Sequence, residues 1–165
     1  MSDLWLTDLK QRLEKRPEDL DAILLEVVNE VTRQLGADRS TLYLVDHASN
    51  KLVSRVAQLP EIAEIRLRLG EGVAGEVART GRVQHLRRGE RPPNAARRID
   101  GATGYHTQCL LAAPVRDPQY NVIAVIEALN KVDGDFDDSD EELVKRLAAQ
   151  VGELLLASSL RHQLV

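Results

Sequence analysis

The sequence is poor in cysteine and in aromatic residues. Its 165 residues include one cysteine, Cys109, and aromatic side chains make up 3% of the chain. A single cysteine excludes an internal disulfide and argues against a structural zinc cage. Leu, Val, Ile and Ala must therefore fill the core, and a hydrophobic content of 43% is enough for one ordinary domain.

Long apolar runs and a strong charge of one sign are also absent. No run approaches the roughly 20 apolar residues that span a membrane, and the N-terminal stretch MSDLWLTDLKQRLEKR lacks the apolar centre of a secretion signal. The formal net charge is -4, which does not favour nucleic acid as a partner. We expect a soluble, cytoplasmic protein with neither a membrane nor a nucleic-acid partner.

The spacing of apolar residues predicts an α+β domain with a mostly antiparallel sheet. Leu, Ile and Val recur at three- and four-residue steps, which indicates helices, in residues 4–13, 20–35 and 143–154. Alternating or strongly apolar segments predict strands at 40–46, 51–57, 64–69, 83–86, 109–115 and 121–129. We expect a short helix at 73–80 and a long loop at 87–104. Hairpin-like links dominate, which favours antiparallel pairing.

The stretch RLGEGVAGEV places Gly70, Gly72 and Gly75 at the G-x-G-x-x-G spacing of dinucleotide-binding sites. That fingerprint requires a buried parallel strand before it, whereas the preceding EIRLRL alternates apolar and charged residues like a hairpin strand. We expect the glycines to shape a tight strand-to-helix corner. The free N–H groups of the first helical turn could also face an anion there.

The stretch NKVDGDFDDSDE resembles the N-K-F-D-E signature of GAF domains, in particular those that regulate cyclic-nucleotide phosphodiesterases and bacterial adenylyl cyclases. The matching positions are Asn130, Lys131, Phe136, Asp140 and Glu141. The stretches GVAGEVARTG and DGATGYHTQCLLAAPV resemble further segments of the same family.

The resemblance implies a GAF fold, which is similar to the PAS and profilin folds. Its central antiparallel sheet carries the N- and C-terminal helices on one face and a ligand pocket on the other. We expect an amphipathic N-terminal helix at 1–16, the GAF domain at 17–160 and a tail at 161–165. Lys131 should end the last strand and pair with Asp140, partly buried, while Phe136 plugs the loop between them. Ser139 and Glu142 have the spacing of a helix capping box.

In cyclic-nucleotide-binding GAF domains the ligand lies between the sheet, the short helix and the loop that follows it. The resemblance therefore implies seven ligand-contacting positions, which are Thr41, Val73, Ala74, Asp100, Thr103, Thr107 and Glu127. Cyclic AMP or cyclic GMP is the implied ligand, and another small molecule is the alternative. Ala57 and Ala96 replace the aromatic residues that stack on the base, and Gln58 replaces an acid.

The implied function is a non-catalytic sensor that signals to an output domain or partner through a homodimer of its terminal helices. The apolar positions for that dimer are Leu4, Leu6, Leu9, Leu13, Leu143, Leu147, Val151 and Leu154. The four histidines follow no metal-ligand spacing, so we expect no metal site. A dimerising scaffold without ligand is the main alternative, and an enzyme is a more distant one. The arginine-rich residues 79–98 are either a solvated flap paired with the acidic loop or a lid over the pocket.

Overall fold

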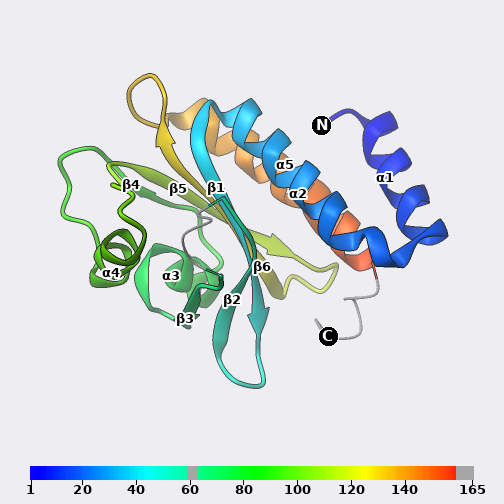
Figure 1. The fold of residues 1–165 in the computed structure, drawn as a ribbon, viewed down its shortest axis with the longest axis horizontal. Coiled ribbons are helices and arrows are strands. Elements are labelled where there is room, and N and C mark those ends of the chain that lie inside the picture. Colours follow the sequence, from blue (N-terminus) through cyan, green and yellow to red (C-terminus); the bar gives the residue numbers. More distant parts are fainter. Residues whose placement is uncertain (59–62, 159–165) are drawn as a thin grey trace.

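An antiparallel six-stranded sheet runs through the computed structural model, which describes residues 1–58 and 63–158 (Figure 1). The strand order is β3-β2-β1-β6-β5-β4, and all neighbouring pairs are antiparallel. The strands are β1 (Ala37–Asp46), β2 (Lys51–Ala57), β3 (Arg66–Arg68), β4 (Gln84–Leu86), β5 (Leu110–Arg116) and β6 (Val122–Lys131). The predicted antiparallel α+β architecture is confirmed. The predicted C-terminal tail lies outside the described residues.

Helices cover the two faces of the sheet unequally (Figure 1). One face carries α2 (Leu20–Leu35) and α5 (Asp138–Ala157), with α1 (Asp3–Lys15) outside them and a short 3-10 turn, η1 (Pro17–Asp19), leading into α2. The other face carries α3 (Gly72–Thr80) and α4 (Asn94–Thr103). Each face has its own buried apolar cluster, because alternate residues of every strand point to opposite sides.

The apolar stripes of the terminal helices are largely buried within the chain. Leu147, Val151 and Leu154 of α5 are at most 1% exposed. The inner face of α1 is also buried in the same cluster, through Leu6, Leu9 and Leu13. The abundance of apolar positions that predicted a dimer is therefore accounted for by α1 packing on the other helices. Leu4 is the exception, since it is 85% exposed.

Two local predictions are wrong. Residues 94–103 form the helix α4, whereas we expected a loop at 87–104. The prolines before Asn94 leave the following Ala- and Arg-rich segment free to form a helix, and Gly104 ends it with a φ of 73°. The cap of α5 is Asp137 and not Ser139: the Asp137 side chain accepts from the Asp140 N–H, and the Asp140 side chain accepts from the Asp137 N–H.

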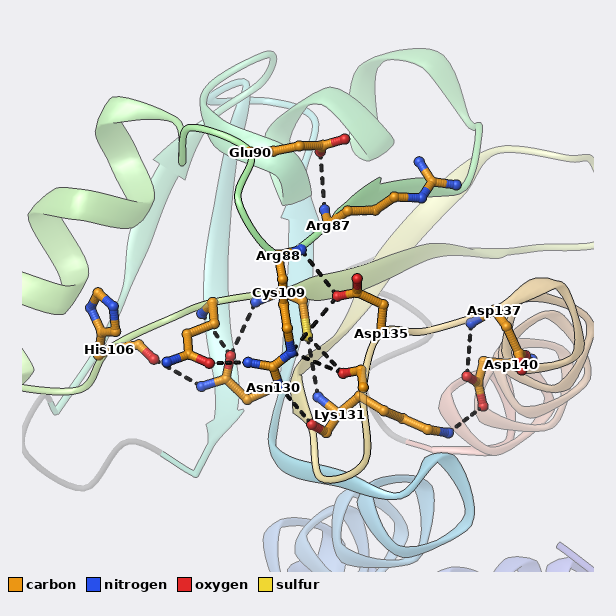
Figure 2. A network of polar contacts seen from close by, with 12 residues as sticks. Arg87, Arg88, Glu90, His106, Cys109, Asn130, Lys131, Asp135, Asp137 and Asp140 are labelled. Carbon is orange, nitrogen blue, oxygen red and sulfur yellow. Dashed lines mark hydrogen bonds and ion pairs between the residues drawn. The ribbon is translucent and has the colours of Figure 1, made fainter.

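Lys131 joins the ends of three elements (Figure 2). Its ammonium group donates to the Asp140 carboxylate at the start of α5 (2.7 Å) and to the Leu35 carbonyl at the end of α2 (2.8 Å). The Asp140 side chain is 7% exposed and that of Lys131 is 21% exposed. Phe136 is buried beneath the intervening loop, with the Lys131 nitrogen 5.8 Å from its ring centroid. The structure thus contains the partly buried ion pair that the resemblance implied.

The two outer members of the signature fix neighbouring strands. Asn130 has a φ of 55°, and its side-chain oxygen accepts from the N–H groups of Gln108 (2.7 Å) and Cys109 (3.2 Å) at the entry to β5. Glu141 on α5 lies 3.0 Å from the ring nitrogen of His85 on β4. The signature therefore connects β6 and α5 to the sheet edge formed by β4 and β5.

Replacing Lys131 with alanine should destabilise the fold. The Asp140 carboxylate would stay buried without its cation, which we expect to lower the free energy of unfolding by about 2–3 kcal/mol. Urea unfolding measures this change. Lys145→Ala is the matched control, because Lys145 also pairs with acids of α5 but is exposed. Equal midpoints for both variants would contradict the structural role of Lys131.

Candidate functional site

A small cavity lies between the sheet, α3 and α4, on the face opposite the terminal helices. The lining residues come from strands, both helices and the entry to β5; they are Tyr43, Leu67, Gly72, Val73, Ala74, Ala95, Ala96, Ile99, Asp100, Thr107, Leu110, Glu127 and Leu129. Its volume is about 30 Å³, which is room for about one or two water molecules. The cavity is therefore small and partly open to the surface, with α4 forming one of its walls.

Five of the seven predicted ligand-contacting residues line this cavity: Val73, Ala74, Asp100, Thr107 and Glu127. Thr103 does not, because its hydroxyl donates to the Ile99 carbonyl (3.0 Å) and accepts from the Tyr105 N–H (3.1 Å) at the end of α4. Thr41 is also absent from the lining, although it lies directly opposite Glu127 in the β1–β6 pairing. Because directly opposed residues point to one face, Thr41 lies beside the cavity.

Asp100 and Thr107 hold the end of α4 against the start of β5. The Asp100 carboxylate accepts from the Thr107 N–H and from the Thr107 hydroxyl, both at 2.8 Å. Both donors are neutral, so they satisfy the carboxylate oxygens without cancelling the negative charge. A ligand that reaches Asp100 must therefore share or replace these two bonds.

Glu127 is a buried acid in the middle of β6. It is 9% exposed, and its carboxyl group has no hydrogen-bond partner in the described part of the chain. Burial, and secondarily the negative charge of Asp100, raises the pKa of Glu127 to about 7. The hydroxyl of Thr41, 1% exposed, is likewise buried without a described partner. Buried polar groups without partners are rare. The Ser40 hydroxyl is another such group among the described residues, but as the neighbour of Thr41 on β1 it points to the opposite face of the sheet.

The glycines shape the corner between β3 and α3. A Cβ on Gly75 would lie 2.6 Å from the Arg68 carbonyl oxygen, and one on Gly72, whose φ is 68°, would lie 3.0 Å from the Ala95 Cβ. The preceding strand β3 is a short antiparallel edge strand, which excludes the dinucleotide fingerprint. The cap residue Glu71 makes no side-chain bond to the helix start, so the first N–H groups of α3 are available at the cavity.

Of the three positions at which this chain departs from the family's base-binding residues, one lies at the cavity and two do not. Ala96 lines the cavity. The Gln58 side chain instead accepts from the Thr32 hydroxyl (2.9 Å) and the Ser40 N–H (2.7 Å), on the side of α2. Ala57 is partly buried in the apolar cluster beneath α3 but does not line the cavity.

Sequence reasoning missed the helix that closes the site. Ala95 and Ile99 of α4 both line the cavity, and their spacing of four residues is the signal that would have predicted an amphipathic helix. Arg98 of α4 pairs with Glu71 at the start of α3 (3.0 Å). The arginine-rich segment thus contains the outer wall of the cavity, while Arg88 lies 3.9 Å from Asp135 of the acidic loop.

The described residues show neither a metal site nor a reactive thiol. No cluster of three or more His, Cys, Asp or Glu side chains there is arranged to hold a metal ion, and no helix there has the length and apolar character needed to cross a bilayer. Burial raises the pKa of the Cys109 thiol, which favours the unreactive protonated form. Cys109 accepts from the Lys131 N–H (3.3 Å), so it is part of the structural network.

Comparison with known proteins identifies similar sequences and folds. The family model for the GAF domain matches residues 19–155. The chain is 27% identical over 160 residues to a Caenorhabditis elegans protein named "Probable 3',5'-cyclic phosphodiesterase pde-5", covering 90% of the chain and 22% of that protein. It is 30% identical over 135 residues to the Drosophila melanogaster "Dual 3',5'-cyclic-AMP and -GMP phosphodiesterase 11", covering 72% of the chain and 9% of that protein.

The fold is similar to that of a free methionine-R-sulfoxide reductase from Neisseria meningitidis, solved in complex with its substrate. The TM-score is 0.71 with 21% sequence identity, and the alignment covers 93% of this chain and 87% of the other. The chain spans less than a quarter of the length of the two phosphodiesterases, with 22% and 9% coverage.

Glu127→Gln should change how stability depends on pH. The folded pKa of Glu127 is about 7 against an ordinary 4.5, so the native state binds more protons than the unfolded state between these values. The free energy of unfolding of the unmodified protein should therefore fall by about 3 kcal/mol as pH rises through this window. The glutamine variant should lack this fall and be the more stable protein at pH 8.

Urea unfolding at pH 5, 6, 7 and 8 measures the difference. Glu14→Gln on α1 is the control, since Glu14 is exposed and its replacement should leave the pH profile unchanged. If the free energy of unfolding of Glu127→Gln depends on pH in the same way as that of the unmodified protein, the site does not raise the pKa of the Glu127 carboxyl group.

Proposed function

Because this chain belongs to the GAF domain family, we propose that it is a non-catalytic regulatory module that binds a small molecule between the sheet, α3 and α4. The observation that carries this proposal is the pair of buried groups without described partners, the Glu127 carboxyl and the Thr41 hydroxyl. A ligand that donates to Glu127 would compensate for its desolvation. Because the cavity volume is about 30 Å³, a ligand larger than a few atoms would require α4 to move outward.

Cyclic nucleotides are the first ligands to test, because two similar proteins are named as cyclic-nucleotide phosphodiesterases. The N–H groups of Val73 and Ala74 at the start of α3 could face a cyclic phosphate, and Glu127 could accept from a ribose hydroxyl. The base would have no aromatic side chain to stack on at Ala96. Since each such contact is worth roughly 1–3 kcal/mol, binding should be weak.

The proposed signal passes from the wall of the cavity to α5 through Arg88 (Figure 2). Arg88 follows β4 on the segment that leads to α4, and its N–H donates to the Asp135 carboxylate (3.0 Å). Its guanidinium donates to the carbonyls of Lys131 (2.8 Å) and Gly134 (3.0 Å) and to the Gln108 side chain. Outward movement of α4 would therefore strain the loop that leads into α5.

The output in this proposal is a homodimer formed through the terminal helices, acting on an output domain or partner protein. The exposed Leu4 of α1 supports such a contact. The second candidate function is a module that dimerises without a ligand. It is favoured by the small volume of the cavity, about 30 Å³.

Ala96→Tyr should strengthen cyclic-nucleotide binding. The new ring would lie at the cavity wall and supply the stacking surface that the chain lacks, which corresponds to about tenfold tighter binding. Isothermal titration with cyclic AMP and cyclic GMP measures the effect. Ala102→Tyr, on the exposed side of α4, should bind like the unmodified protein. If the folded variants give no heat with cyclic AMP or cyclic GMP at millimolar concentration, the two nucleotides are excluded as ligands.

Leu4→Glu should weaken the proposed dimer. Sedimentation velocity at tens of micromolar should show a dimer of the unmodified chain and at least about tenfold weaker association of the variant, since a charge would be buried at the contact. Tyr120→Ser is the control, because Tyr120 is also exposed but lies in the β5–β6 turn. A monomer for the unmodified chain would contradict helix-mediated dimerisation.

A further inference from the structure

The cavity of the proposed sensor is lined by acids and contains no basic side chain among its described lining residues. We propose that the ligand of this pocket carries a protonated nitrogen, which binds the Glu127 carboxylate beside Asp100. This inference rests on the proposed function, because it assigns a chemical class to the ligand of the same pocket. An organic ammonium is the simplest member of that class.

The described residues supply no hydrogen bond to the Glu127 carboxyl group, which leaves room for a donor from a ligand. Thr41 lies opposite Glu127 on β1 and Ala112 lies opposite it on β5, so the strands bring one unpaired hydroxyl and one methyl group to its sides. The titratable groups that face Glu127 are Tyr43 on β1 and Asp100 on α4. Burial raises the pKa of Tyr43 well above its usual value, so it is neutral and leaves the negative charge of Glu127 in place.

Two arginines on this side of the sheet are engaged with other groups. Arg98 on α4 pairs with Glu71 and is 60% exposed. Arg39 on β1, opposite Leu129, lies over the Tyr105 ring, 4.3 Å from its centroid. A cationic ligand would gain attraction from both Glu127 and Asp100 in a poorly hydrated site. A monoanion, such as the phosphate of the cyclic nucleotides considered above, would meet repulsion from the same two groups, which is a second reason to expect those nucleotides to bind weakly. The negative charge of the pocket therefore favours a cation over an anion of similar size.

The rest of the pocket suits a short apolar tail. Ile99, Leu110 and Leu129 line the cavity together with two alanines of α4. Since the cavity volume is about 30 Å³, the tail would displace α4 and would then be covered by these side chains. A small aliphatic ammonium thus matches both the charge and the apolar character of the lining.

Matched probes of one size test the charge preference. Butylammonium, butan-1-ol and butyrate are titrated at equal ionic strength into isotopically labelled protein, with amide NMR shifts at Thr41, Thr107 and Glu127 as the readout. We expect butylammonium to bind at least about tenfold more tightly than the other two. Its affinity should also rise about tenfold from pH 6 to pH 8, as Glu127, with a pKa of about 7, becomes ionised.

Variants distinguish the contribution of the Glu127 charge from that of the shape of the cavity. Glu127→Gln should remove the preference for butylammonium, and Asp100→Asn should reduce it to a smaller extent while retaining an acceptor for Thr107. Asp133→Asn, an exposed acid in the β6–α5 loop, is the control and should bind like the unmodified protein. If Glu127→Gln does not fold, the Asp100→Asn titration and the pH dependence of the unmodified protein decide the question.

The outcomes distinguish this inference from the function on which it rests. Butanol or a cyclic nucleotide shifting the pocket resonances as strongly as butylammonium would overturn the cation preference and leave the sensor function intact. Butylammonium binding that is unaffected by Glu127→Gln and by pH would also overturn it. If no probe and neither cyclic nucleotide shifts these resonances, both the cation preference and the proposed pocket function are wrong.

Discussion

The Lys131 ammonium group is the contact on which the rest of the architecture depends. It lies at the end of β6, a central strand with β1 on one side and β5 on the other. By binding the Asp140 carboxylate and the last carbonyl of α2, it neutralises a buried acid and the negative end of a helix together. The start of α5 and the end of α2 are thereby fixed relative to the middle of the sheet.

Buried acids are paired with a cation on one face of the sheet and lack one on the other. On the side of the terminal helices, Lys131 and Asp140 meet directly and are further hydrogen-bonded. On the side of α3 and α4, Glu127 lies next to another acid with no cation in the described lining. The first arrangement stabilises the fold, whereas the second lowers stability at neutral pH. The stabilising ion pair and the destabilising acid are therefore located on different faces of the sheet.

Local sequence signals predicted the frame well and the site incompletely. Apolar periodicity located the strands, whereas the Lys131–Asp140 pair was implied by the resemblance to the family signature. Asp100 and Glu127 were also assigned to one pocket by that resemblance. Because the segment containing α4 was expected to be a loop, the small volume of the cavity and its helical wall were not predicted. Asp137 was missed as the cap because Ser139 offered a competing spacing.

The difference between α3 and α4 determines which wall of the cavity can move. Gly75 brings α3 so close to the Arg68 carbonyl that even a methyl group would collide, so α3 is packed tightly on the corner. In α4, by contrast, Ala95 is the one buried residue, and the Arg98–Glu71 pair that fastens the helix is partly exposed. Since little apolar surface and an exposed ion pair contribute little stability, α4 can separate at a lower free-energy cost than α3. Of the two helices on this face, α4 is therefore the one that can separate more easily, and it follows the segment that Arg88 connects to the loop before α5.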